Sequence, residues 1–93
     1  APSLSMAKLG IEKTLEHAKR RRDEAAADPE LAFMADDADD LESIVSQFEY
    51  EVNQGASPGS FSEELRSSAR RLDTAVRDDI HPNLYYSLFP EIL

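Results

Sequence analysis

The sequence contains no cysteine and no tryptophan, and its 93 residues include only three glycines and five prolines. Without cysteine the chain has no disulfide framework, no thiolate metal site and no cysteine nucleophile. The low glycine and proline content excludes a collagen-like or linker-like chain. No apolar run approaches the roughly 20 residues needed to span a bilayer, and no secretory signal is visible, so we expect a cytoplasmic protein with no membrane partner.

Basic residues are missing from one long stretch of the chain. The sequence has 19 acidic and 10 basic side chains and a formal net charge of −9. No lysine or arginine stands between Arg22 and Arg66, although this interval is rich in aspartate and glutamate. Such a charge repels phosphates and anionic lipids and favours basic partners, so we expect no nucleic-acid partner.

The chain is expected to be one helical domain covering residues 1–93. Its hydrophobic fraction of 41% suffices for one core, and no strand-like alternation of apolar and polar residues is found. Residues 1–5 are interpreted as an added or disordered extension, with Met6 as the natural start. The first helix is predicted over residues 4–27, although Gly10 lowers its helix propensity by about 1 kcal/mol. Its apolar face consists of Leu4, Ile11, Leu15, Ala18 and Ala25.

The strongest helical pattern predicts one continuous helix over residues 29–54. Its apolar residues step by three and four, which is a heptad seam of the coiled-coil type. They are Leu31, Met34, Ala38, Leu41, Val45, Phe48 and Val52. Asp28, Pro29 and Glu30 have the order of an N-cap, a first-turn proline and a first-turn acid, and Gly55 predicts a left-handed stop.

A third helix is predicted over residues 61–80, with Ser60 and Glu63 as a capping box and Pro82 beyond its end. A short fourth helical element is predicted over residues 83–89. The fold class is therefore all-α, an up-down-up three-helix bundle with a short C-terminal fourth element. The apolar residues 84–93 leave two alternatives open, because they can cover the open end of the bundle or bury their aromatic side chains in a second copy.

Antiparallel packing of the first two helices would bring opposite charges together. The basic end of the first helix, residues 19–22, would meet the acidic start of the second. Four consecutive helical residues spread over about 300° of the helix, so this tract cannot form one flat basic patch. Likewise, the arginines of the third helix, Arg66, Arg70 and Arg71, would meet Glu49 and Glu51.

The remaining carboxylates and the C-terminal aromatic residues are the candidate partner-binding residues. They are Asp36, Asp37, Asp39, Asp40, Glu42, Glu49, Glu51, Tyr85, Tyr86 and Phe89. We expect them to dock a basic surface of a partner protein. The protein would then be a small, acidic, non-enzymatic interaction module, such as an adaptor or inhibitor.

Two other functions are weighed against this one. The apolar C-terminus could make the protein a homo-oligomeric assembly protein. Alternatively, Asp36, Asp39 and Asp40 share one helix face and could hold Mg²⁺ in a nucleotide hydrolase. No facing helix offers a matching acidic pair, so we expect no metal and no cofactor. His17 is expected on a solvated face and His81 in a capping role, and neither belongs to a catalytic pattern.

Overall fold

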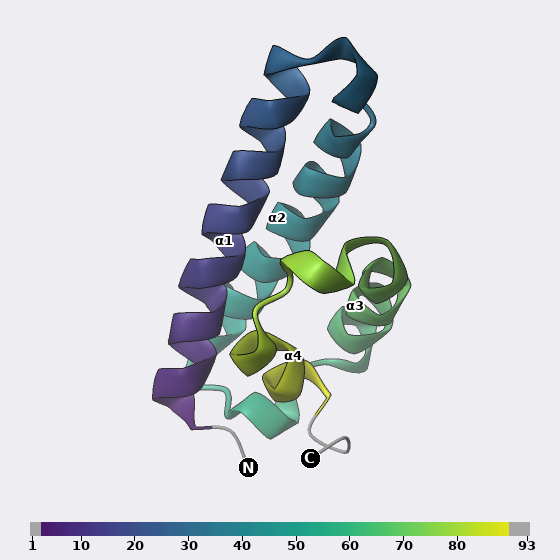
Figure 1. Ribbon diagram of the computed structural model, residues 1–93. Helices are drawn as coiled ribbons and strands as arrows, with labels where there is room; N and C mark the ends of the chain where they lie inside the picture. Colours follow the sequence, from purple (N-terminus) through teal and green to yellow (C-terminus); the bar gives the residue numbers. More distant parts are fainter. Residues whose placement is uncertain (1–2, 90–93) are drawn as a thin grey trace.

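The computed structural model describes residues 3–89, which form four α-helices and no strand (Figure 1). The predicted all-α class is confirmed. The α-helices are α1 (Leu4–Ala27), α2 (Met34–Asn53), α3 (Glu63–Val76) and α4 (Pro82–Leu88). Three short 3-10 turns join them, η1 (Pro29–Leu31), η2 (Pro58–Ser60) and η3 (Arg77–Asp79). None of these helices is both long and apolar enough to cross a bilayer.

The ends of α1 are those predicted from the sequence. Ser3 is its N-cap and accepts a hydrogen bond from the backbone N–H of Met6. Residues 3–5, which belong to the interpreted extension, form the cap and the first residues of this helix. The other residues of the interpreted extension, 1 and 2, and the last residues of the apolar segment, 90–93, lie outside the described residues.

The prediction of one continuous helix over residues 29–54 is wrong at its N-terminal end. Asp28 caps as expected, accepting from the N–H of Glu30, but the turn that follows is η1 and not α-helix. The N–H groups of Leu31 and Ala32 donate to carbonyls three residues back, which winds the chain more tightly than an α-helix. The α-helix begins again at Met34, after Phe33.

The apolar residues of the predicted seam are buried from Met34 onward. They are Met34, Ala38, Leu41, Val45, Phe48 and Val52. Gly55 has a φ of +92°, the left-handed conformation predicted for the residue after this helix. Leu31, the first residue of the predicted seam, lies on η1 and is only half-buried.

The predicted start of α3 is also wrong. Ser62, not Ser60, is the N-cap and accepts from the N–H of Leu65, whereas Ser60 belongs to η2. Phe61 explains the difference. Its backbone is extended and its buried ring packs against Phe48, with ring centroids 3.9 Å apart. The helix therefore begins after Phe61, because the extended backbone of this residue directs its ring into the core.

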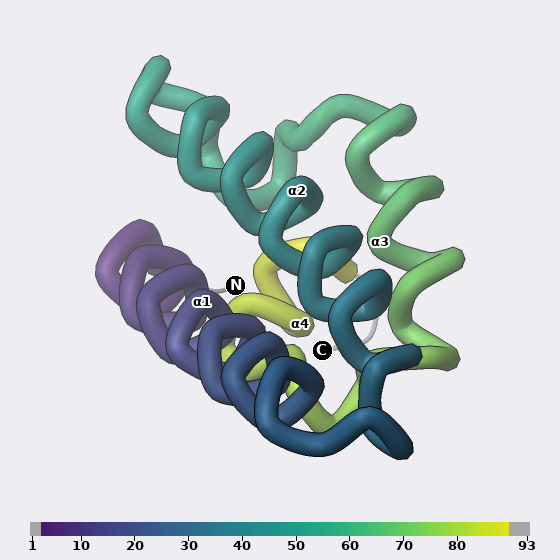
Figure 2. Tube along the Cα trace, turned by 90° about the horizontal axis from the view of Figure 1, so that it is seen from above, coloured from purple at the N-terminus to yellow at the C-terminus, as the bar shows by residue number. Residues whose placement is uncertain are grey.

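The expected up-down-up arrangement of three helices is not confirmed. α1 and α2 form an antiparallel hairpin along the long dimension of the molecule, whereas Figure 1 views α3 close to its own axis. α3 therefore crosses the hairpin and packs against α2. Seen from above, α4 lies between α1 and α3 (Figure 2). α4 takes the place beside α1 that a third bundle helix would fill.

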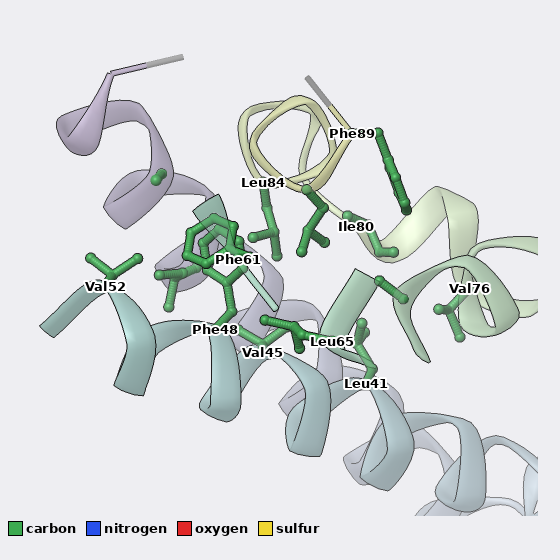
Figure 3. Packing of buried hydrophobic residues seen from close by; sticks show 14 of the residues in the cluster. Leu41, Val45, Phe48, Val52, Phe61, Leu65, Val76, Ile80, Leu84 and Phe89 are labelled. Carbon is green, nitrogen blue, oxygen red and sulfur yellow. The ribbon is translucent and has the colours of Figure 1, made fainter. Parts of the chain in front are cut away.

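The core lies where α4 covers the lower half of the hairpin. Phe48, Leu84 and Leu88 are among its largest fully buried side chains. Figure 3 shows Leu84 and Phe61 close to the α2 side chains Val45 and Phe48. Of the two alternatives for the C-terminal segment, the described residues show the first, because α4 folds back onto this chain's own core.

Gly10 allows α4 to approach α1 closely. A Cβ atom at this position would lie 2.8 Å from the Cα of Leu84 and closer still to its backbone nitrogen. Only the missing side chain of glycine leaves room for the backbone of a second helix at this distance. The hydroxyl of Thr14, one turn further along α1, accepts a hydrogen bond from the N–H of His81.

We expect Gly10→Ala to lower the free energy of unfolding by about 1–3 kcal/mol, because the new methyl group must push α4 away. Helix propensity alone predicts the opposite sign, a gain of about 1 kcal/mol. The control is Gly59→Ala, since a Cβ there meets nothing within 4 Å. Urea unfolding followed by circular dichroism measures both variants. A Gly10→Ala protein as stable as the unmodified one would contradict the packing of α4.

Candidate protein-docking surface

The end of the α1–α2 hairpin reaches beyond α3 and α4 (Figure 1). We call residues 23–42 the hairpin apex; it comprises the last turn of α1, η1 and the first half of α2. The apex contains nine acidic side chains and no lysine, arginine or histidine. They are Asp23, Glu24, Asp28, Glu30, Asp36, Asp37, Asp39, Asp40 and Glu42.

The basic tract before the apex sends its side chains to different elements, as the helical geometry predicted. Lys19 lines a groove between α1 and α2, and Arg20 is exposed. Arg21 forms an ion pair with Asp79 of η3, whereas Arg22 pairs with Asp39, at 3.1 Å, and with Glu42 of α2. The predicted attraction between the end of the first helix and the start of the second is therefore made by Arg22.

These carboxylates hold both guanidinium groups in their charged form. Hydrogen bonding to Asp79 raises the pKa of Arg21 above its ordinary value, against the opposing effect of burial. Hydrogen bonds to Glu42 and Asp39 raise the pKa of Arg22 in the same way. Each arginine is therefore a permanent cation that neutralises carboxylates near the base of the apex.

The charge of the apex is only partly compensated. Of its nine carboxylates, Asp39 and Glu42 alone take part in the ion pairs formed within residues 3–89. Asp36 and Asp40 lie one helical turn apart, are exposed, and form no such pair. Asp37 is half-buried, and its field acts on Arg21. An anionic surface therefore remains on the outer side of the apex.

Phe33 lies within the apex, between Glu30 and Asp36 in the chain. Its side chain is 65% exposed, the largest fraction among the large hydrophobic residues in the described part of the chain. It also occupies the N-cap position of α2 and gives that helix no side-chain hydrogen bond. Phe33 is not among the candidate residues predicted from the sequence. The available signal was its position between two residues of the heptad seam, Leu31 and Met34, where it falls outside the apolar stripe.

Glu49 and Glu51 do not belong to the same surface. Glu49 lies with Lys8, Leu15 and other residues along a shallow groove of about 560 Å³ between α1 and α2. Glu51 is half-buried, and one of its carboxylate oxygens is buried without a hydrogen-bond partner among the described residues.

The pairs predicted between these two glutamates and the arginines of α3 are not among the ion pairs of the described residues. Arg66 donates to the carbonyl of Gly59, and Arg71 donates to Ser68. Arg70 pairs with Glu63 on its own helix. The crossing of α3 explains the difference, because a helix that runs across α2 does not follow its charged flank.

The predicted aromatic contact residues lie on α4, away from the hairpin apex (Figure 1). Phe89 is buried at 3% exposure, with the guanidinium of Arg70 5.4 Å from its ring centroid, so almost none of this residue is open to a partner. Tyr85 is half-buried and packs edge-on against Phe89. Tyr86 is 36% exposed. The ten predicted residues therefore do not form one surface.

The candidate metal ligands in the described residues are the acidic side chains and the two histidines. Within residues 3–89, no three histidine or acidic side chains converge as metal ligands. The Nδ1 atom of His17 lies 4.0 Å from Asp79, a neighbour that the sequence did not indicate, but this carboxylate already pairs with Arg21. His81 caps α4 by accepting from the N–H of Asn83, which confirms its predicted role.

No protein-family model matches the sequence, and neither a curated protein nor a solved structure matches the chain. The case for a function therefore depends on the geometry and the electrostatics described above.

The ion pair between Arg21 and Asp79 holds η3 against α1. Asp79 is 8% exposed, so Asp79→Asn would leave a poorly solvated guanidinium without its counter-charge. We expect a loss of about 1–3 kcal/mol in the free energy of unfolding. Asp78→Asn is the matched control, since Asp78 is exposed, and its effect should stay within about 0.5 kcal/mol. Urea unfolding compares the two variants. Equal stability of both would show that this ion pair does not stabilise the packing of η3 against α1.

Proposed function

We propose that the protein is a non-enzymatic interaction module whose hairpin apex docks a basic surface of another protein. The observation that carries the proposal is the surplus of carboxylates at the apex. Nine acidic residues lie within residues 23–42, and Arg22 is the only cation paired with any of them in the described part of the chain.

Such a concentration of charge is unfavourable for the isolated protein. Like charges at i and i+4, such as Asp36 and Asp40, destabilise a helix by about 0.2–0.5 kcal/mol per pair. Asp36 and Asp37 lie in the first turn of α2, where the helix dipole favours them, but Asp39 and Asp40 lie beyond that turn. A negative net charge that served only solubility could be distributed over the whole surface. Binding of a basic partner explains why the acidic side chains are concentrated at one end of the molecule.

The shape of the molecule supports the same proposal. The described residues span 40 × 21 × 21 Å, and the apex is one end of the long axis. A projecting anionic end attracts a cationic surface at long range and accelerates their encounter. Because the attraction acts through solvent, salt screens it over a Debye length of about 10 Å at 0.1 M.

The test is capture of a partner from extracts of the cells that make the protein. We expect the immobilised protein to retain a basic protein at about 50 mM salt and to release it at about 500 mM. A variant with Glu30→Gln, Asp36→Asn and Asp40→Asn removes three unpaired charges from the apex. It should lose most of the captured partner even at the lower salt concentration, because the attraction depends on these charges.

The matched control removes three charges elsewhere, by Glu12→Gln, Glu64→Gln and Asp78→Asn. These side chains are exposed and lie outside the apex, and the net charge of this variant equals that of the apex variant. It should retain the partner as the unmodified protein does. Capture that is insensitive to salt, or equal loss in both variants, would reject the apex as a docking surface.

A further inference from the structure

Phe33 is a large apolar side chain that the core leaves out. It is 65% exposed, so it contributes little to the core. Its backbone is helical, and the N–H group of Ala35 is already bonded to the carbonyl of Ala32, so position 33 has no capping role either. The exposed ring is therefore unexplained by the stability of this chain. Such departures are expected at functional positions.

The surroundings of Phe33 indicate what would cover it. Glu30 lies three residues before it and Asp36 three residues after it, and both are exposed. Pro29 and Ala32, which precede Phe33 in the chain, are also exposed. An exposed apolar group is therefore flanked in the chain by an acidic residue on each side. The complementary surface is an apolar pocket with a cationic rim.

We infer that Phe33 is the hydrophobic anchor of the docking surface, and that it enters an apolar pocket bordered by arginine or lysine in the partner protein. The inference rests on the proposed function, since it assigns the anchor residue and the partner's chemistry at the same surface. Interfaces commonly depend on one central aromatic residue surrounded by a polar rim. Arginine suits this rim, because its guanidinium can pair with carboxylates and also lie on an aromatic face.

Two synthetic peptides of equal length and charge serve as probes. Both place arginine on one side of a helix, and they differ in that one carries leucine and the other glutamine on the opposite side. Fluorescence anisotropy at about 50 mM salt should show about tenfold or more tighter binding of the leucine peptide to the unmodified protein. Phe33→Ser should abolish this preference and leave the weaker binding of the glutamine peptide unchanged. Phe33→Leu should retain most of the preference, because the anchor stays apolar.

Tyr50→Ser is the matched control, since Tyr50 is a second aromatic residue of α2 and is 59% exposed. It should bind both peptides as the unmodified protein does. If Phe33→Ser keeps the preference for the leucine peptide, or Tyr50→Ser loses it equally, the anchor assignment is wrong while the proposed function stands. If neither peptide binds the unmodified protein in a salt-dependent manner, the proposed function itself fails.

Discussion

The contact between α4 and the α1 backbone at Gly10 is the constraint on which the rest of the arrangement depends. Without a side chain at this position, the backbone of Leu84 reaches α1, and Leu84 and Leu88 fill the core beside Phe48. α4 then occupies the place of a third bundle helix, and α3 crosses α2 instead. Because α4 has only seven residues, it covers the lower half of the hairpin and leaves the apex uncovered.

The same arrangement decides where charge remains. Consecutive residues of α1 point about 100° apart, so Arg21 reaches η3 and Arg22 reaches α2. Both cations form ion pairs near the base of the apex. Arg21 pairs with Asp79, and Arg22 pairs with two of the nine carboxylates of the apex. The uncovered end of the hairpin is therefore also the uncompensated end. Packing at one end of the molecule and uncompensated charge at the other are in this way two consequences of one fold.

Features that depend on near neighbours could be predicted from the sequence. Patterns within a few residues predict the ends of α1 and the buried face of α2. They also predict the caps at Asp28 and His81 and the helix stop at Gly55. The surplus of carboxylates in the interval without lysine or arginine could also be counted from the sequence. These features needed no knowledge of the tertiary structure.

Features that depend on distant contacts could not be predicted. The shift of the cap from Ser60 to Ser62 depends on Phe61 packing against Phe48. Gly10 reads in the sequence as a weak point of a helix, and only the approach of α4 gives it a structural role. The break before Met34 consists of η1, whose hydrogen bonds span three residues and not four, and no pattern in the sequence distinguishes this turn from the first turn of an α-helix.

The most direct test of the account is site-specific photocrosslinking. A photoreactive phenylalanine derivative replaces Phe33 in one protein and Tyr50 in another, and both are irradiated in extracts of the cells that make the protein. The account predicts that position 33 crosslinks one basic protein at about 50 mM salt and not at about 500 mM, while position 50 crosslinks none. Crosslinking of the same protein from both positions, or crosslinking from position 33 that high salt leaves unchanged, would contradict it.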